Sequence, residues 1–196
     1  MHVIIIHGST FSIKKPKWLK KLTNRLITHL HIGPPSISYA YKFKNYLKNK
    51  SIEAEVFEWD GSIWLKDIKE ASEKLDSIIK NKNDKVILFS KSNGGLIAQF
   101  SALNNENKVS KIIQLATPNI SRYYSNNIPI ENIYSHYDKM QIAGILLHSI
   151  STFRRGSRSL KGKYVNNRLL DLRKHREFNS EKMFGFYYSL IKHNSI

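Results

Sequence analysis

Residues 85–97 read Lys-Val-Ile-Leu-Phe-Ser-Lys-Ser-Asn-Gly-Gly-Leu-Ile, and this stretch decides the fold. The four apolar residues from Val86 to Phe89 are typical of a buried parallel strand. A turn of small and polar residues follows, and an apolar helical pattern begins at Leu96. A serine on a tight turn between a strand and a helix is the pattern of a nucleophile elbow, which presents the serine hydroxyl. The candidate nucleophile is therefore Ser92.

The elbow leaves little room for side chains two positions on either side of the nucleophile. Gly94 meets this requirement on the downstream side, and Gly95 allows the helix to pack closely. The upstream position is Ser90, where glycine is usual. This departure keeps a second reading open, in which the chain is a non-catalytic binding protein that uses its basic face for membrane or nucleic acid.

Strands and helices are predicted to alternate along the chain. We expect strands at 3–6, 53–58, 86–89, 111–115, 132–135 and 164–172. We expect helices at 36–50, 62 or 67 to 80, 93–103, 140–150 and 178–191. This alternation is typical of an α/β fold with a mostly parallel sheet. The 196 residues suit a single domain spanning 1–196.

The net charge of +17 is large and uneven. Residues 1–50 hold ten Lys or Arg and no acid, whereas residues 51–84 hold nine of the fifteen acids. Residues 151–176 hold nine Lys or Arg against one acid. The excess of Lys and Arg has two interpretations. It reflects a general bias in composition, with the basic residues on the solvated surface, or it attracts an anionic partner such as a phospholipid surface, a phosphorylated substrate or nucleic acid.

Several kinds of chemistry and location are disfavoured by the composition. Absence of cysteine excludes disulfides, thiolate zinc sites and cysteine nucleophiles. His29 and His31 lack an evident third ligand, and no phosphate-loop or dinucleotide motif occurs, so no metal or cofactor is expected. The N-terminus lacks the features of a secretory signal, and we expect a cytoplasmic protein. The aromatic residues do not interleave with basic ones, which disfavours nucleic acid as a partner.

Four candidate functional positions follow predicted strands. They are His7-Gly8, Ser92, Asp138 and His175. Sites in open parallel sheets lie at the carboxyl ends of the strands, so these residues are expected to share one edge. His175 is the candidate base for the Ser92 hydroxyl, and Asp138 would orient the imidazole.

Two further residues are candidates for stabilising an oxyanion, and two acids compete with Asp138. The backbone N–H groups of Asn93 and Ser9, or of Thr10, are the expected oxyanion donors. Asp171 is expected inside the last strand, and Glu177 is expected to open the last helix. His7 is interpreted as a structural residue of the oxyanion loop.

These motifs resemble the α/β-hydrolase superfamily, and within it the small lipase- and esterase-like members. The resemblance is carried by segments 3–8, 90–95, 112–119, 133–138 and 172–175, and the order serine, acid, histidine matches. It implies a minimal form without the first two strands of larger members. It also implies a serine hydrolase that forms an acyl-enzyme on Ser92, with Asp138 as acid and His175 as base.

The resemblance also guides the expected partners. Carboxylic esters are the leading substrates, with thioesters or amides handled by the same machinery. Segments 9–35 and 139–163 are expected to form lid or pocket-rim segments. Because both are basic, we expect an anionic ester or an anionic membrane surface as partner. The oligomeric state is left open.

Overall fold

The computed structural model describes residues 1–9, 36–120, 124–172 and 174–193. The predicted lid segment at 9–35 therefore lies outside the described residues from residue 10 onward, and so do His29 and His31.

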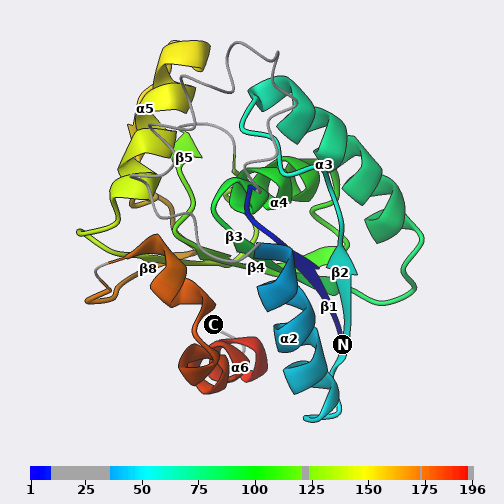
Figure 1. Cartoon of the computed structure of the whole chain (residues 1–196). Coiled ribbons are helices and arrows are strands. Elements are labelled where there is room, and N and C mark those ends of the chain that lie inside the picture. The colour runs from blue at the N-terminus through cyan, green and yellow to red at the C-terminus, as the bar shows by residue number, and fades with distance from the viewer. Residues whose placement is uncertain (10–35, 121–123, 173, 194–196) are drawn as a thin grey trace, which may run out of the picture.

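A parallel sheet of six strands forms the centre of the molecule (Figure 1). Its spatial order is β2-β1-β3-β4-β6-β8, and every neighbouring pair is parallel. The strands are β1 (His2–Ile6), β2 (Glu53–Phe57), β3 (Val86–Lys91), β4 (Val109–Leu115), β6 (Ile130–Tyr134) and β8 (Val165–Leu169). The prediction of an α/β fold with a minimal, mostly parallel sheet of about six strands is confirmed.

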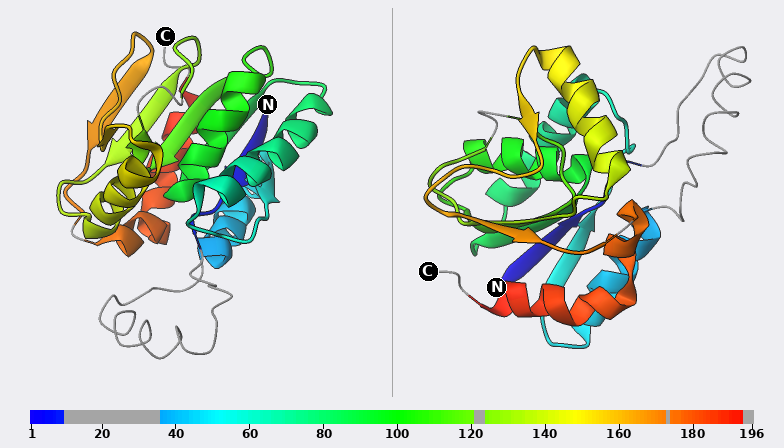
Figure 2. Two further views of the ribbon diagram at one scale, coloured as in Figure 1. Left: turned by 90° about the horizontal axis from the view of Figure 1, so that it is seen from above. Right: turned by 90° about the vertical axis from the view of Figure 1, so that its left-hand side faces the viewer.

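Helices cover both faces of this sheet (Figures 1 and 2). One face packs against α3 (Leu65–Lys80) and α4 (Asn93–Asn104), and the other against α2 (Ser36–Lys48) and α6 (Phe184–Lys192). A further helix, α5 (Lys139–Thr152), lies against a small antiparallel sheet of β5 (Asn119–Ile120) and β7 (Gly156–Ser157).

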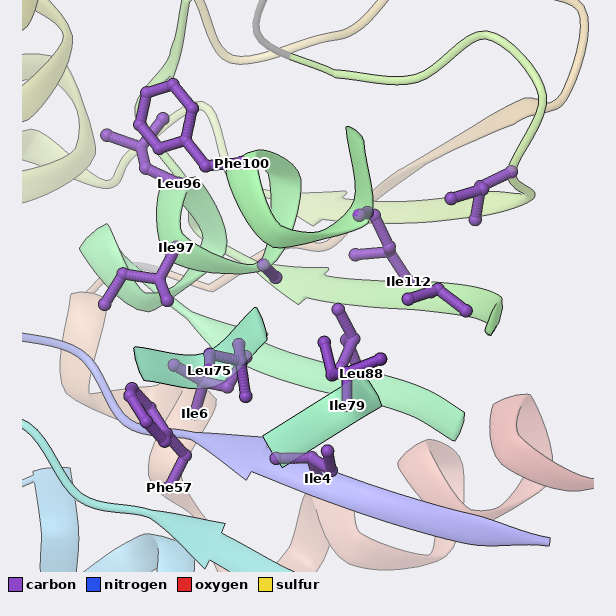
Figure 3. Packing of buried hydrophobic residues seen from close by; sticks show 14 of the residues in the cluster. Ile4, Ile6, Phe57, Leu75, Ile79, Leu88, Leu96, Ile97, Phe100 and Ile112 are labelled. Carbon is purple, nitrogen blue, oxygen red and sulfur yellow. The ribbon is translucent and has the colours of Figure 1, made fainter. Parts of the chain in front are cut away.

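The helices on both faces explain why Val3–Ile6 of β1 and Val86–Phe89 of β3 are apolar without alternation. Every residue of β1 is buried. Successive side chains of a strand point to opposite faces, so Ile4 and Ile6 join the core on the α3 and α4 side (Figure 3). Val3 and Ile5 join the second core, against α2 and α6. Strands buried on both faces read as continuous hydrophobic runs.

The small sheet was not predicted, and buried amides explain its stability. Nε2 of Gln99 donates to Oδ1 of Asn119 at 2.7 Å, and Nε2 of Gln114 donates to Oδ1 of Asn132 at 2.7 Å. Asn119 and Asn132 each donate to the carbonyl oxygen of Arg158 at 2.9 Å. Contacts between distant segments therefore fix a ladder that is too short to have a periodic signal.

Two predictions near the C-terminus were wrong in detail. The last strand ends at Leu169, so Asp171 follows the strand and does not lie within it. The last helix begins at Phe184 instead of residue 178, because Ser180 has an extended backbone that interrupts it (φ −71°, ψ 133°). Residues 175–183 form two 3-10 helices, η1 (His175–Asn179) and η2 (Glu181–Met183). Within the described part of the chain, no helix is long and apolar enough to cross a bilayer.

Candidate active site

The backbone of Ser92 is the first sign of a functional site. Ser92 lies between β3 and α4 with φ 51° and ψ −131°, a conformation that residues with a side chain rarely adopt. Its N–H donates to the carbonyl oxygen of Leu115 at 2.8 Å, and its carbonyl oxygen accepts from the N–H of Gly95 at 2.9 Å. Strain of this kind costs on the order of 1–3 kcal/mol and persists where surrounding contacts hold it. A sharp, strained turn is the geometry of a nucleophile elbow.

The two glycines after Ser92 fill positions where no side chain fits. A Cβ on Gly94 would lie 2.4 Å from the carbonyl oxygen of His7 and 2.8 Å from that of Ile6. A Cβ on Gly95 would lie 1.9 Å from Oγ1 of Thr117. The first obstacle is backbone and cannot rotate away. The end of β1 therefore packs directly on the start of α4.

Ser90, the unusual residue of the elbow, fits its position. Its side chain is completely buried, and its Oγ donates to the carbonyl oxygen of Ile113 at 3.3 Å. The hydroxyl is thus paired with the neighbouring strand β4, and a buried hydroxyl with a partner carries little penalty.

The structure brings Asp138 and His175 together. Asp138 is fully buried at the N-cap of α5, where its Oδ1 accepts from the N–H of Gln141 at 3.0 Å. Its Oδ2 lies 2.6 Å from Nδ1 of His175, the first residue of η1. This bond fixes the imidazole and directs its other nitrogen, Nε2, away from the carboxylate. Asp171, a rival in the sequence, is exposed.

Ser92 itself is half-buried, and its Oγ makes no hydrogen bond to His175 within the part of the chain that the structure describes. Hydrogen bonds between nucleophile and base are often long in unliganded enzymes and shorten when substrate binds. The strained turn at Ser92 and the hydrogen-bonded pair of Asp138 and His175 are thus two separate features of this structure.

Sequence reasoning missed Lys91, the residue directly before Ser92. Its side chain is buried, and its Nζ donates to Oδ1 of Asn179 at 2.8 Å, which links the elbow to η1. Burial lowers the pKa of Lys91 to about 7, opposed by the charge of Asp138. A lysine that follows an apolar run is normally exposed to solvent, so nothing in the sequence indicated that Lys91 is buried.

The pKa of His175 is lowered from its ordinary value. Burial is the main cause, and the nearby charge of Lys91 adds to it, whereas the hydrogen bond and charge of Asp138 oppose it. The imidazole is therefore mostly neutral at pH 7, which is the form that accepts a proton.

The two predicted oxyanion residues lie in one hydrogen-bonded group. Nδ2 of Asn93 donates to Oγ of Ser9 at 2.8 Å, and Oγ of Ser9 donates to the carbonyl oxygen of Ser62 at 3.1 Å. Asn93 is the first residue of α4, where a backbone N–H has no partner within the helix.

His148 of α5 completes this group and was also missed in the sequence. Its Nε2 lies 3.0 Å from Oδ1 of Asn93. Burial lowers its pKa to about 4, so the ring is neutral at pH 7 and Nε2 donates to the amide oxygen. The interaction orients the Asn93 side chain toward Ser9.

His7 has a structural environment. Its Nδ1 donates to the carbonyl oxygen of Gly8 at 2.7 Å, and the indole N–H of Trp59 donates to the carbonyl oxygen of His7 at 3.0 Å. These bonds shape the turn after β1, from which Ser9 approaches Asn93.

Comparisons with known proteins agree with this architecture. No family model matches the chain, and no curated protein matches it by sequence. Among solved structures, a monoacylglycerol lipase from Paleococcus ferrophilus aligns with a TM-score of 0.58 and 12% identity, over 97% of this chain and 91% of its own. Est1E from Butyrivibrio proteoclasticus aligns with the same TM-score and identity, over 97% and 85%.

A third solved structure names the architecture directly. Alpha/beta hydrolase domain-containing protein 10 from mouse aligns with a TM-score of 0.56 and 12% identity, over 96% of this chain and 87% of its own. The chain has the α/β-hydrolase fold. Ser92, Asp138 and His175 follow β3, β6 and β8 of the sheet, respectively.

Proposed function

We propose that the protein is a serine hydrolase that cleaves carboxylic esters through an acyl-enzyme on Ser92. The proposal depends most on one observation, the strained backbone of a serine at the turn between β3 and α4. Residues with a side chain rarely adopt this backbone conformation, and the close packing at Gly94 maintains it. The 2.6 Å bond between Asp138 and His175 supports the same reading.

In the first half-reaction, Nε2 of His175 accepts the hydroxyl proton while Oγ of Ser92 bonds to the ester carbonyl carbon. The carbonyl oxygen gains the charge, and the N–H groups of Asn93 and Ser9 are the proposed donors to it. The C–O bond to the alcohol then breaks, and the imidazolium returns the proton to the departing alkoxide. Asp138 stabilises the imidazolium without taking its proton.

In the second half-reaction, water replaces the alcohol. His175 accepts a proton from water as the oxygen attacks the acyl-enzyme, and the carboxylic acid leaves as Oγ of Ser92 recovers the proton. Because the pKa of His175 is lowered, the base is available at and somewhat below neutral pH. The lipase among the solved structures of similar fold supports esters as the substrate class.

The test is labelling by a fluorophosphonate, which reacts with an activated serine. We expect the folded protein to be labelled, Ser92→Ala to lose labelling, and Ser90→Ala to retain it, because Ser90 is buried against Ile113. Absence of labelling on folded protein would favour the non-catalytic binding protein.

A panel of neutral and anionic esters addresses the substrate. The net charge of +17 predicts faster turnover of anionic esters, with an advantage that shrinks as salt is added. Equal salt dependence for neutral and anionic esters would contradict electrostatic recruitment.

A further inference from the structure

An exposed apolar row runs along α5. Ile142, Leu146 and Ile150 are 43%, 61% and 65% exposed, and Phe153 at the C-cap is 97% exposed. Residues four apart lie on the same face of a helix, so the first three form one stripe. A contiguous exposed stripe of large apolar side chains marks an interaction surface more often than an isolated exposed leucine does.

The surroundings of this row are basic. Residues 139–170 contain no Asp or Glu, and they carry seven cations: Lys139, Arg154, Arg155, Arg158, Lys161, Lys163 and Arg168. Of these, Arg168 lies in β8 and is paired with Glu131 at 2.7 Å, so it adds little to the charge of this surface. Arg154 and Arg155 are exposed directly after Phe153. A helix with an apolar stripe and neighbouring cations is the composition that lies in the interface of an anionic bilayer.

Charge decides between the occupants of this surface. A second copy would bring the same basic face and a net charge of +17, which repels. Residues 10–35 also carry Lys and Arg without any acid, so that segment has the same sign. Nucleic acid would pair with the arginines but would gain nothing from the aliphatic stripe. An anionic phospholipid surface complements both features.

We propose that the outward face of α5, with Phe153, Arg154 and Arg155, docks on an anionic phospholipid surface. Asp138 is the N-cap of this helix, and His148 within the helix bonds to Asn93, the residue after Ser92. Docking through α5 therefore holds the candidate active site close to lipid esters. The docking itself needs no catalysis, so it stands or falls independently of the proposed hydrolase activity.

The experiment is co-sedimentation of the full chain with vesicles. Vesicles of phosphatidylcholine mixed with phosphatidylserine are compared with vesicles of phosphatidylcholine alone. We expect binding only to the mixed vesicles, weakened by salt. The double variant Arg154→Gln/Arg155→Gln is expected to bind about 30-fold more weakly. Leu146→Ser/Ile150→Ser is expected to lose a similar factor, because two apolar side chains no longer enter the interface.

Matched controls change the same chemistry elsewhere. Lys80→Gln/Lys85→Gln removes two exposed charges. Leu103→Ser removes an exposed leucine near the end of α4 that is remote from the elbow. Both controls are expected to bind mixed vesicles like the parent, and the α5 variants are expected to hydrolyse a short soluble ester at the parent rate.

Several outcomes would overturn the proposal. One is that the α5 variants and the controls bind mixed vesicles equally. Another is that the parent binds neither kind of vesicle. A third is that the parent sediments as a dimer that Leu146→Ser/Ile150→Ser dissociates, which would assign the stripe to a second copy. A fourth is that the parent binds RNA in place of vesicles and the arginine variant alone weakens that binding.

Discussion

Replacing Lys91 with methionine should stabilise the protein at neutral pH. Methionine keeps the unbranched stem of the lysine and removes its charge. The Lys91 side chain is only 4% exposed, and burial lowers its pKa from 10.5 to about 7. A depressed lysine pKa means that the folded state disfavours the charged form.

The size of the effect follows from that shift. A change from 10.5 to about 7 corresponds to about 5 kcal/mol against the ammonium in the folded state. The methionine variant loses the hydrogen bond to Asn179, which costs about 1 kcal/mol. Allowing for relaxation of the buried amine, we expect a net gain in the free energy of unfolding of about 2–4 kcal/mol at pH 7.

The stability of the parent protein should depend on pH through Lys91. Between pH 7 and 10.5 the unfolded chain holds a proton on Lys91 that the folded chain has released, so parent stability rises with pH across this window. The gain in the free energy of unfolding from Lys91→Met should therefore be largest below pH 7 and should decrease toward pH 10.5. The exposed Lys80→Met serves as the control, with no such dependence.

Urea unfolding of both variants and the parent at neutral and alkaline pH measures this. A Lys91→Met variant that is no more stable than the parent at pH 7 would contradict this prediction, and so would an equal gain in stability at both pH values. A separate consequence is kinetic. The charge of Lys91 lowers the pKa of His175, so the acidic limb of the kcat/KM profile should move to higher pH in the variant.

Three further substitutions test the elbow and the acid. Gly94→Ala should lower the free energy of unfolding by about 3 kcal/mol or more, because the new Cβ would collide with backbone atoms. The control Gly185→Ala has only a tyrosine hydroxyl 3.9 Å from the new Cβ and should change stability by less than about 1 kcal/mol. Thermal unfolding measures both variants. Asp138→Asn keeps a good N-cap for α5, so stability should hold while kcat falls by about 10³-fold or more, and equal kcat would contradict the assigned role. Ser90→Gly should lose about 1 kcal/mol without a change in kcat, and a large rise in kcat would show that serine impairs the elbow.

The sequence was sufficient for elements whose side chains repeat with a clear period or form an unbroken apolar run. The runs Val3–Ile6 and Val86–Phe89 are buried on both faces and contain only apolar residues, so their strands were predicted directly. The tight turn between β3 and α4 was predicted because Gly94 and Gly95 stand where no side chain fits. The order of Ser92, Asp138 and His175 then placed three side chains at one edge of the sheet.

The residues that were missed depend on contacts between distant segments. Lys91 is buried because η1 covers it and Asn179 accepts from its Nζ, and nothing adjacent in the chain indicates this. His148 lies within an apolar helix, and its partner Asn93 is 55 positions away. Asp171 was placed in the last strand because the strand was predicted to extend beyond Leu169. Short ladders and 3-10 helices carry too few residues to show a period.

We propose that Ser92 is a nucleophile activated by His175. Peptide mapping by mass spectrometry after treatment with a fluorophosphonate tests it most directly. We expect one phosphonyl group, on Ser92, and much slower modification of His175→Ala, because Ser92 has then lost its proposed base. A phosphonyl group on another serine, or equal rates with and without the imidazole, would contradict it.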